Sequence, residues 1–243
     1  MICDGTHTNR VECLHITNNR SLSTFPAQLP GTDCGKGVLC GDKILTVGKS
    51  VSATSLKPPF KTTVLASYNE RGKMACGNGI ARVNENAVVL VGGCDRPTRS
   101  SLDPKDGVLL YNMTTKQIEE LAPLPYRLYD MAVVVHNDNI IILGGNKNQY
   151  DVCNDVLMYN ITNQQCSRLP SMLERRSRCA AVIMGDTIVV MGGNSGDEII
   201  YSPLSERPVN PKTAEYLVLG EDTWKNLPLM HHERVGATAC LLP

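Results

Sequence analysis

The sequence predicts an all-β protein built from a repeated unit, and three observations carry this prediction. Short apolar runs end in glycine doublets at Gly92–Gly93, Gly144–Gly145 and Gly192–Gly193, with a degenerate copy at Gly48–Lys49. The first glycines recur at intervals of 44, 52 and 48 residues. A polar turn sequence precedes each doublet at a constant distance. A period of about 50 residues is typical of β-propellers.

Each unit is expected to begin with a β-hairpin. Residues 38–43, 82–87, 134–139 and 182–187 each combine the end of a strand with a turn rich in Gly, Asn and Asp. These residues tolerate positive φ in tight hairpins, and the apolar run that follows supplies the returning strand. The glycine doublet then marks a fixed corner, because glycine permits positive φ and the close approach of another backbone.

Two further strands are expected after each doublet. Leu109–Asn112 and Leu157–Asn160 share a Tyr-Asn ending and begin the third strand of their units. Residues 121–125, 169–172 and 224–230 each close a short fourth strand with proline and apolar residues, after which the chain turns inward again. Each unit therefore has four strands.

The unit around Gly48 is less regular, and two placements of its later strands are open. Val51–Leu56 and Thr62–Ser67 form the third and fourth strands in one placement. In the other, Val64–Tyr68 is the third strand and the fourth is stunted. The first placement keeps the repeat spacing regular and is preferred.

The repeated pattern has a resemblance to a known family. A glycine doublet after an apolar strand, a Tyr in the next strand, and Trp224-x-x-Leu-Pro-x-Met230 followed by Arg234 resemble the kelch repeat, from about Val11 to Leu242. The resemblance implies an all-β kelch-type β-propeller of four-stranded antiparallel blades, with about four full blades and one split or partial blade. A β-sandwich would explain scattered glycines but not their recurrence in the same setting.

The expected units are residues 1–34 (partial), 35–77, 78–129, 130–177, 178–233 and 234–243 (partial). Val11–Ile16 and Ser21–Phe25 are an expected third and fourth strand, and Val235–Leu242 is an expected first strand, so the two ends complement each other but lack a second strand. Two interpretations are open: a five-bladed ring sealed by its ends, or a fragment of a longer propeller. The fragment is favoured, because the sealing blade would keep an unpaired edge.

Composition gives no sign of a nucleic-acid or membrane partner. The chain has 24 Lys plus Arg and 24 Asp plus Glu, with no basic run. No apolar stretch approaches the ~18 residues of a transmembrane helix, and residues 1–10 lack the apolar region of a signal peptide. The expected compartment is the cytoplasm, where the ten cysteines would be reduced thiols.

No catalytic residue, metal site or cofactor is expected. The adjacent His231 and His232 point in different directions on an extended segment and rarely bind one ion together. The chain has no Gly-x-Ser-x-Gly, His-Glu-x-x-His or phosphate-loop motif. Cys94, in an expected loop after a doublet, is the best candidate for a reactive thiol. An enzyme of the galactose-oxidase type is the least favoured alternative.

Recognition of a protein or an acidic peptide remains as the expected function. In kelch propellers, the loops between second and third strands open on the same face as the segments that join a fourth strand to the next blade. The first class comprises residues 94–106, 146–154 and 194–212, whose lengths vary far more than those of the strands. Variation confined to one loop class on a rigid scaffold favours a binding face.

Arginines mark the second class of segment. In kelch substrate receptors, an Arg here, often before a Ser, contacts acidic or hydroxyl-bearing peptides; Arg176-Ser177 matches closely, Arg234 partly, and Arg127 lies one position out of register. Alternatively, Arg176 only bridges carbonyls of the adjacent blade. The candidate partner-binding residues, chosen for guanidinium and aromatic chemistry, are Arg176, Ser177, Arg178, Arg127, Tyr129, Tyr150, Arg234, Arg96 and Arg99.

The family resemblance also implies a cellular role. Many kelch-like propellers are the substrate-recognition part of a ubiquitin-ligase adaptor and connect to cullin-3 through BTB and BACK domains, which this sequence does not contain. The alternative within the same family is a scaffold that binds actin or another cytoskeletal filament.

Overall fold

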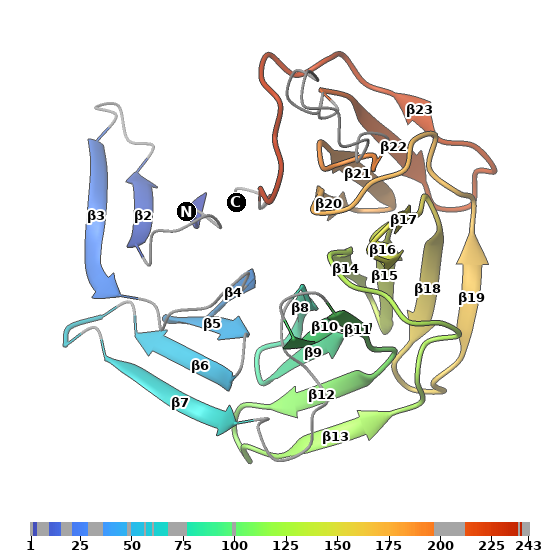
Figure 1. Cartoon of the computed structure of the whole chain (residues 1–243). Helices are drawn as coiled ribbons and strands as arrows, with labels where there is room; N and C mark the ends of the chain where they lie inside the picture. Colours follow the sequence, from blue (N-terminus) through green and yellow to red (C-terminus); the bar gives the residue numbers. More distant parts are fainter. Residues whose placement is uncertain are drawn as a thin grey trace.

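The structure is a ring of small antiparallel sheets (Figure 1). The computed structural model describes residues 2–3, 10–15, 21–28, 36–47, 50–55, 57–59, 61–67, 77–98, 101–196, 212–237 and 239 of the 243-residue chain. Four sheets have four strands each and are named blades A to D in chain order, and a three-stranded terminal sheet precedes them. This arrangement confirms the expected all-β propeller.

Blade A is the sheet of the irregular unit around Gly48. It pairs β4 (Lys36–Cys40), β5 (Lys43–Val47), β6 (Ser50–Ser55) and β7 (Thr62–Ser67) in that order. The preferred placement of its third and fourth strands is therefore confirmed.

Blades B, C and D follow the same antiparallel order from first to fourth strand. Their strands are β8 (Gly79–Asn84), β9 (Ala87–Val91), β12 (Val108–Asn112) and β13 (Ile118–Leu121) in blade B; β14 (Ala132–His136), β15 (Asn139–Leu143), β18 (Val156–Asn160) and β19 (Cys166–Leu169) in blade C; and β20 (Ala180–Met184), β21 (Thr187–Met191), β22 (Ala214–Val218) and β23 (Lys225–Asn226) in blade D.

The fourth strands of blades B and C end at the first of the residues expected to close them. β13 ends at Leu121 and β19 ends at Leu169. Pro123, Pro125 and Pro170 follow, and proline cannot donate a ladder hydrogen bond. The proline-containing residues therefore belong to the segments that cross to the next blade.

The hydrophobic core lies between neighbouring blades. Val88 and Leu90 of β9 pack in a cluster shared with blade A, whereas Val89 and Val91 pack in a cluster shared with blade C. Successive side chains of a strand point to opposite faces of its sheet, so a strand between two other blades must be apolar at every position. All five side chains of β9 are buried, which explains the unbroken apolar runs before the glycines.

The terminal sheet pairs β1 (Ile2–Cys3), β2 (Arg10–His15) and β3 (Ser21–Gln28) in that order. β2 and β3 match the expected third and fourth strands. The expectation that this blade lacks a second strand is wrong, because β1 pairs with β2 in that position. Two residues are too short to show a strand pattern in sequence. Of the expected first strand Val235–Leu242, residues 235–237 and 239 are described and are not in a strand.

Two small hairpins replace loops expected between second and third strands. β10 (Cys94–Thr98) pairs with β11 (Ser101–Pro104), and β16 (Asn146–Asn148) pairs with β17 (Asp151–Val152). In the second hairpin the Asn148 side chain accepts a hydrogen bond from the Tyr150 N–H at 2.9 Å, which closes the turn. Across the described ranges, no helix is long and apolar enough to cross a membrane.

Candidate partner-binding face

Three crossing segments, residues 122–131, 170–179 and 227–237, lead from the fourth strand of a blade toward the next blade. Each is fastened to the glycine doublet of the blade that it leaves. The second glycine of the doublet donates its N–H to a carbonyl oxygen of the segment: Gly93 to Leu128 at 2.8 Å, Gly145 to Arg176 at 2.8 Å and Gly193 to Arg234 at 2.7 Å.

The first glycine of a doublet leaves room for the same carbonyl. At Gly144, φ is +59° and an added Cβ would lie 2.1 Å from the carbonyl oxygen of Arg176. Both the left-handed backbone and the close approach therefore require glycine. The expected structural role of Gly92, Gly93, Gly144, Gly145, Gly192 and Gly193 follows from these contacts.

The crossing segments also pair with the loops between second and third strands. Tyr129 and Asn146 form an isolated antiparallel bridge between blades B and C, and Ser177 and Asn194 form the same bridge one blade later. The N–H of Leu128 donates to the carbonyl of Lys105 at 2.9 Å. Both loop classes are therefore on one face, where the predicted partner-binding residues were placed.

Four residues, which we call the inner ring, are linked by main-chain hydrogen bonds. Gly77, Asp130 and Arg178 lie two residues before the first strands of blades B, C and D, and Gly236 lies in the last crossing segment. The N–H of Asp130 donates to the Gly77 carbonyl at 2.6 Å, that of Arg178 to the Asp130 carbonyl at 2.7 Å, and that of Gly236 to the Arg178 carbonyl at 2.9 Å. All four residues have positive φ, between +54° and +72°. Their shared conformation shows that they occupy equivalent positions, although two are glycines, one is an aspartate and one is an arginine.

Arg178 is the cationic member of this inner ring. Its Nε donates to the Asp130 carboxylate at 2.9 Å, and its side chain is 45% exposed, against 9% for Asp130. A guanidinium has five N–H donors in a planar fork that matches a carboxylate. Arg178 thus combines a fixed position with an accessible side chain.

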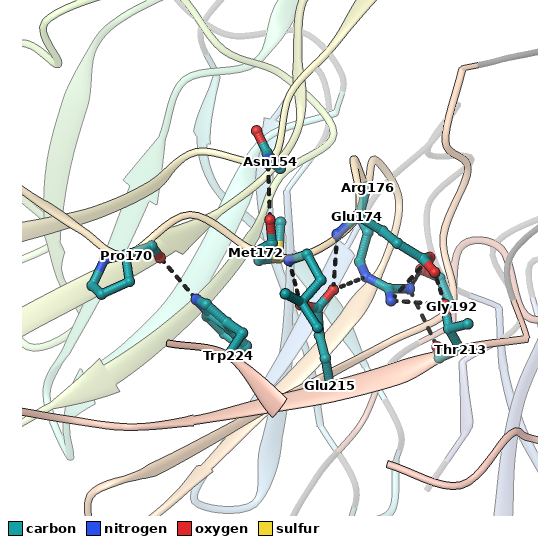
Figure 2. A network of polar contacts seen from close by, with 10 residues as sticks. Asn154, Pro170, Met172, Glu174, Arg176, Gly192, Thr213, Glu215 and Trp224 are labelled. Carbon is teal, nitrogen blue, oxygen red and sulfur yellow. Dashed lines mark hydrogen bonds and ion pairs between the residues drawn. The ribbon is translucent and has the colours of Figure 1, made fainter. Parts of the chain in front are cut away.

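Arg176 does not lie on the accessible surface, which corrects the prediction that it contacts a partner. Its side chain is 0% exposed and crosses into blade D (Figure 2). Nε donates to Glu215 at 2.9 Å, Nη1 to the Gly192 carbonyl at 2.8 Å and Nη2 to the Thr213 hydroxyl at 2.8 Å. The alternative reading, in which Arg176 bridges adjacent blades, describes this geometry.

Glu215 completes the buried network around Arg176. Its carboxylate accepts the main-chain N–H of Leu173 at 2.6 Å and that of Glu174 at 3.4 Å (Figure 2). Nearby, the Trp224 indole N–H donates to the Pro170 carbonyl at 2.8 Å. Glu215 and Trp224, both from blade D, thus hold the crossing segment that contains Arg176.

The other candidates divide between buried and exposed positions. Ser177 and Tyr129 are buried, and this burial corrects their assignment as contact residues. The Ser177 hydroxyl donates to the Asn194 carbonyl, and the Tyr129 hydroxyl donates to the Asn148 carbonyl. Tyr150, at the tip of the β16–β17 hairpin, is 73% exposed. Arg127 is exposed and forms an ion pair with Asp103 at 3.3 Å.

Three further arginines were predicted at or near this face. Arg234 is exposed, and its Nη1 donates to the adjacent Glu233 carbonyl at 3.3 Å. The backbone of Arg96 lies in β10. Arg99 lies outside the described residues.

Sequence reasoning missed a charged cluster around Tyr126. The Tyr126 hydroxyl donates to Asp155 at 2.7 Å, Lys147 pairs with the same carboxylate at 2.8 Å, and Arg168 lies 3.4 Å from it. Lys147 also lies over the Tyr126 ring, 4.7 Å from its centroid. Burial alone would raise the pKa of Asp155, but hydrogen bonds from Lys147 and Tyr126 hold the pKa below its usual value. Burial and the Asp155 hydrogen bond raise the pKa of Tyr126.

Metal and thiol chemistry receive no support from the described part of the chain. It contains no group of three or more His, Cys, Asp or Glu side chains placed to hold a metal ion. Cys94 is 1% exposed and its thiol donates to the Asp95 carbonyl, so the prediction of an accessible reactive thiol is wrong. The residue starts β10 and packs inward where sequence indicated a loop.

Comparison with known proteins supports the reading of the repeats. Residues 127–173 match the family model of the Kelch motif. The chain is 33% identical over 66 residues to Kelch-like protein 40 of Xenopus laevis; this match covers 27% of the chain and 10% of that relative. The solved structure described as "Structure of YjhT" is similar with a TM-score of 0.66 and 15% identity, over 84% of this chain and 68% of that chain, which shows the fold alone.

A ring of four-stranded antiparallel blades with a loop face around its centre defines a β-propeller. The match to the Kelch motif and the recurring glycine doublets indicate a propeller of the kelch type. The chain has the fold of a kelch-type β-propeller, and residues 127–173 match the Kelch motif.

Proposed function

We propose that this kelch propeller is a non-catalytic binding module that recognises a protein or an acidic peptide on the face of the crossing segments. The observation that carries the proposal is Arg178, an accessible guanidinium fixed at the inner ring by main-chain hydrogen bonds on both sides. A cation held in place loses little freedom on binding, so more of its interaction energy contributes to affinity.

The charge of the neighbouring residues supports an acidic partner. Arg175 and Arg234 are exposed on the second and third crossing segments, where Glu233 is exposed as well. Guanidinium groups bind carboxylates through two parallel hydrogen bonds. The exposed ring of Tyr150 adds an aromatic surface on the same loop face, of the kind enriched at binding hot spots.

The cellular role is the finer part of the proposal. The chain would be the substrate-recognition part of a kelch-like ubiquitin-ligase adaptor in the cytoplasm, with cullin-3 reached through other domains. Its support is the similarity to Kelch-like protein 40, which extends over about a tenth of that relative. An actin-binding scaffold and a kelch-fold enzyme of the galactose-oxidase type have no observation of their own in their favour.

A charge-reversal pair tests the binding face. The chain would be screened against a fluorescent peptide library in which every peptide carries three acidic residues, and the best binder titrated at low and high salt. Arg178→Glu should weaken binding at least about tenfold, because like charges replace an attractive pair. Lys116→Glu is the matched control, since Lys116 is exposed in the β12–β13 turn, at the far end of β12 from the loop face.

Salt should weaken wild-type binding and leave little further effect in Arg178→Glu, because the lost contact is ionic. Unchanged affinity of a folded Arg178→Glu variant would refute the site. If no peptide of the library binds the wild type, the acidic-peptide assignment is wrong.

A further inference from the structure

Asp130 and Arg178 place opposite charges side by side in the inner ring. The Arg178 Nε donates to the Asp130 carboxylate at 2.9 Å, and the two residues precede the neighbouring blades C and D. The other two inner-ring residues, Gly77 and Gly236, carry no side chain. A ligand anion that binds to Arg178 therefore also meets the negative charge of Asp130.

The Asp130 carboxylate is held in a fixed place. One oxygen, Oδ2, accepts the Arg178 Nε–H, and the other, Oδ1, lies over the backbone of Gly77, where an added Cβ would be only 2.8 Å from it. The Asp130 N–H donates to the Gly77 carbonyl at 2.6 Å, and the Asp130 carbonyl accepts the Arg178 N–H at 2.7 Å. Contacts with both neighbours of the inner ring thus fix the carboxylate beside the guanidinium.

The main-chain hydrogen bonds of the inner ring do not require this carboxylate. Gly77 and Gly236 form the same bonds without a side chain, and their φ values of +68° and +72° are close to the +59° of Asp130. The negative charge at position 130 is therefore a feature of this one position, and its effect is on what the neighbouring arginine attracts.

A fixed negative charge beside a cation discriminates between anions of different charge. An ionised Asp or Glu side chain carries one negative charge, whereas a phosphorylated side chain carries about 1.5 to 2 at pH 7. Arg178 alone would favour the more highly charged phosphate, because the Coulomb attraction scales with the charge of the ligand. An anion bound to the guanidinium lies well within the Debye length of ~8 Å from the Asp130 carboxylate, so the repulsion also scales with that charge and offsets the preference.

We propose that Asp130 is a specificity-determining residue of the inner ring, which selects the singly charged carboxylates of Asp and Glu side chains over phosphorylated side chains. The inference rests on the proposed function, since Arg178 is the group that binds the ligand anion. A charge built against a competing ligand is a general source of specificity. Neutralising Asp130 therefore admits phosphate to the same site.

Paired peptides test this selection. The best acidic peptide of the library and three copies of it, each with phosphoserine at one of the three acidic positions, are titrated into the wild type and Asp130→Asn at one salt concentration. Asparagine tolerates the left-handed backbone and keeps an oxygen that accepts the Arg178 Nε–H, but it removes the charge. We expect the affinity for at least one phosphopeptide, relative to the parent peptide, to rise at least about threefold in Asp130→Asn.

Asp138→Asn is the matched control. Asp138 is exposed and follows β14, whereas Asp130 precedes it, so the two carboxylates lie at opposite ends of this strand. The ratio of the two affinities should stay at its wild-type value in Asp138→Asn. If thermal unfolding shows that Asp130→Asn does not fold, Asp130→Gly gives the same comparison, because glycine occupies the equivalent positions 77 and 236.

An unchanged ratio at all three positions, or an equal rise for the parent peptide and its phosphorylated copies, would overturn the role of Asp130. Arg178→Glu separates this failure from that of the proposed function. If Arg178→Glu weakens binding while Asp130→Asn leaves the ratio unchanged, only the selection by charge is wrong. If Arg178→Glu binds as the wild type does, or no peptide binds the wild type, both proposals are wrong.

Discussion

Arg176 and Glu215 form an ion pair with an Nε to Oε1 distance of 2.9 Å, and neither side chain reaches solvent. Buried charges are costly to desolvate, and the pair is sustained because the remaining donors and acceptors are also satisfied. Arg176 reaches the Gly192 carbonyl and Thr213, while Glu215 accepts two main-chain N–H groups. This arginine therefore connects two blades.

Removing one partner of this pair should destabilise the fold strongly. Arg176→Met leaves the Glu215 carboxylate buried without its cation, and we expect a loss of about 3–5 kcal/mol in the free energy of unfolding. Urea denaturation measures it. Arg175→Met, at an exposed neighbouring position, should change stability by less than about 0.5 kcal/mol.

Replacing both partners should restore much of the loss. Arg176→Leu with Glu215→Leu places apolar side chains at both positions, and buried ion pairs replaced by apolar residues are often neutral in their effect on stability. A loss in Arg176→Met of under ~1 kcal/mol would mean that the network is not essential to the blade junction.

Replacing a doublet glycine by alanine should destabilise the fold far more than replacing a turn glycine by alanine. Gly144 and Gly185 have nearly the same φ, +59° and +54°, but only at Gly144 does an added Cβ meet a backbone carbonyl, 2.1 Å away. Gly185→Ala should cost about 1–2 kcal/mol for the left-handed backbone. Gly144→Ala adds a displacement of the crossing segment and should cost several times more. Equal midpoints of urea unfolding for the two variants would contradict this reading of the doublets.

The Tyr126 cluster predicts a pH dependence of stability. The folded pKa of Asp155 lies below its usual value of about 3.9, so its contribution is complete above pH ~4 and is lost as pH falls through the folded pKa. Asp155→Asn should therefore lower Tm most at pH 7, with the difference from wild type shrinking below pH ~4. Thermal unfolding at pH 7, 5 and 3 measures it; a constant difference would argue against an ionic role.

Trp224 gives a local probe of the junction between blades C and D. It is the single tryptophan of the chain, is buried, and donates to the Pro170 carbonyl. Trp224→Phe removes this donor and leaves the buried carbonyl unpaired, so we expect a loss of about 1–3 kcal/mol. Loss of the hydrogen bond is indicated if the variant is destabilised while its far-ultraviolet circular dichroism is unchanged; unchanged stability would show that the bond contributes nothing.

The blades could be predicted from the sequence because the same backbone geometry recurs in each of them. Gly144 and Gly192 both have positive φ, and at both an added Cβ would clash with a backbone carbonyl oxygen. The same geometry therefore requires glycine at the same place in these units. The role of Arg176 was not predictable from its own segment. Its partner Glu215 lies 39 residues later in another strand. An arginine fits both a surface contact with a partner and a buried ion pair, so the residue type does not distinguish the two roles.

The Tyr126 cluster escaped prediction for a related reason. Tyr126, Lys147, Asp155 and Arg168 come from a crossing segment, a hairpin, the residue before a third strand and a fourth strand, and no local spacing connects them. Sequence periodicity reports which face of a strand is apolar, and it carries no information on which polar groups of different elements meet.

The inner ring has a consequence for how such a protein diversifies. Gly77, Asp130, Arg178 and Gly236 are joined through N–H and carbonyl groups that every residue type except proline possesses. Mutations that exchange side chains compatible with the left-handed backbone can therefore accumulate there without dismantling the scaffold. Evolution can recode the charge at the middle of this face one position at a time, and relatives with the same architecture can come to select unrelated ligands.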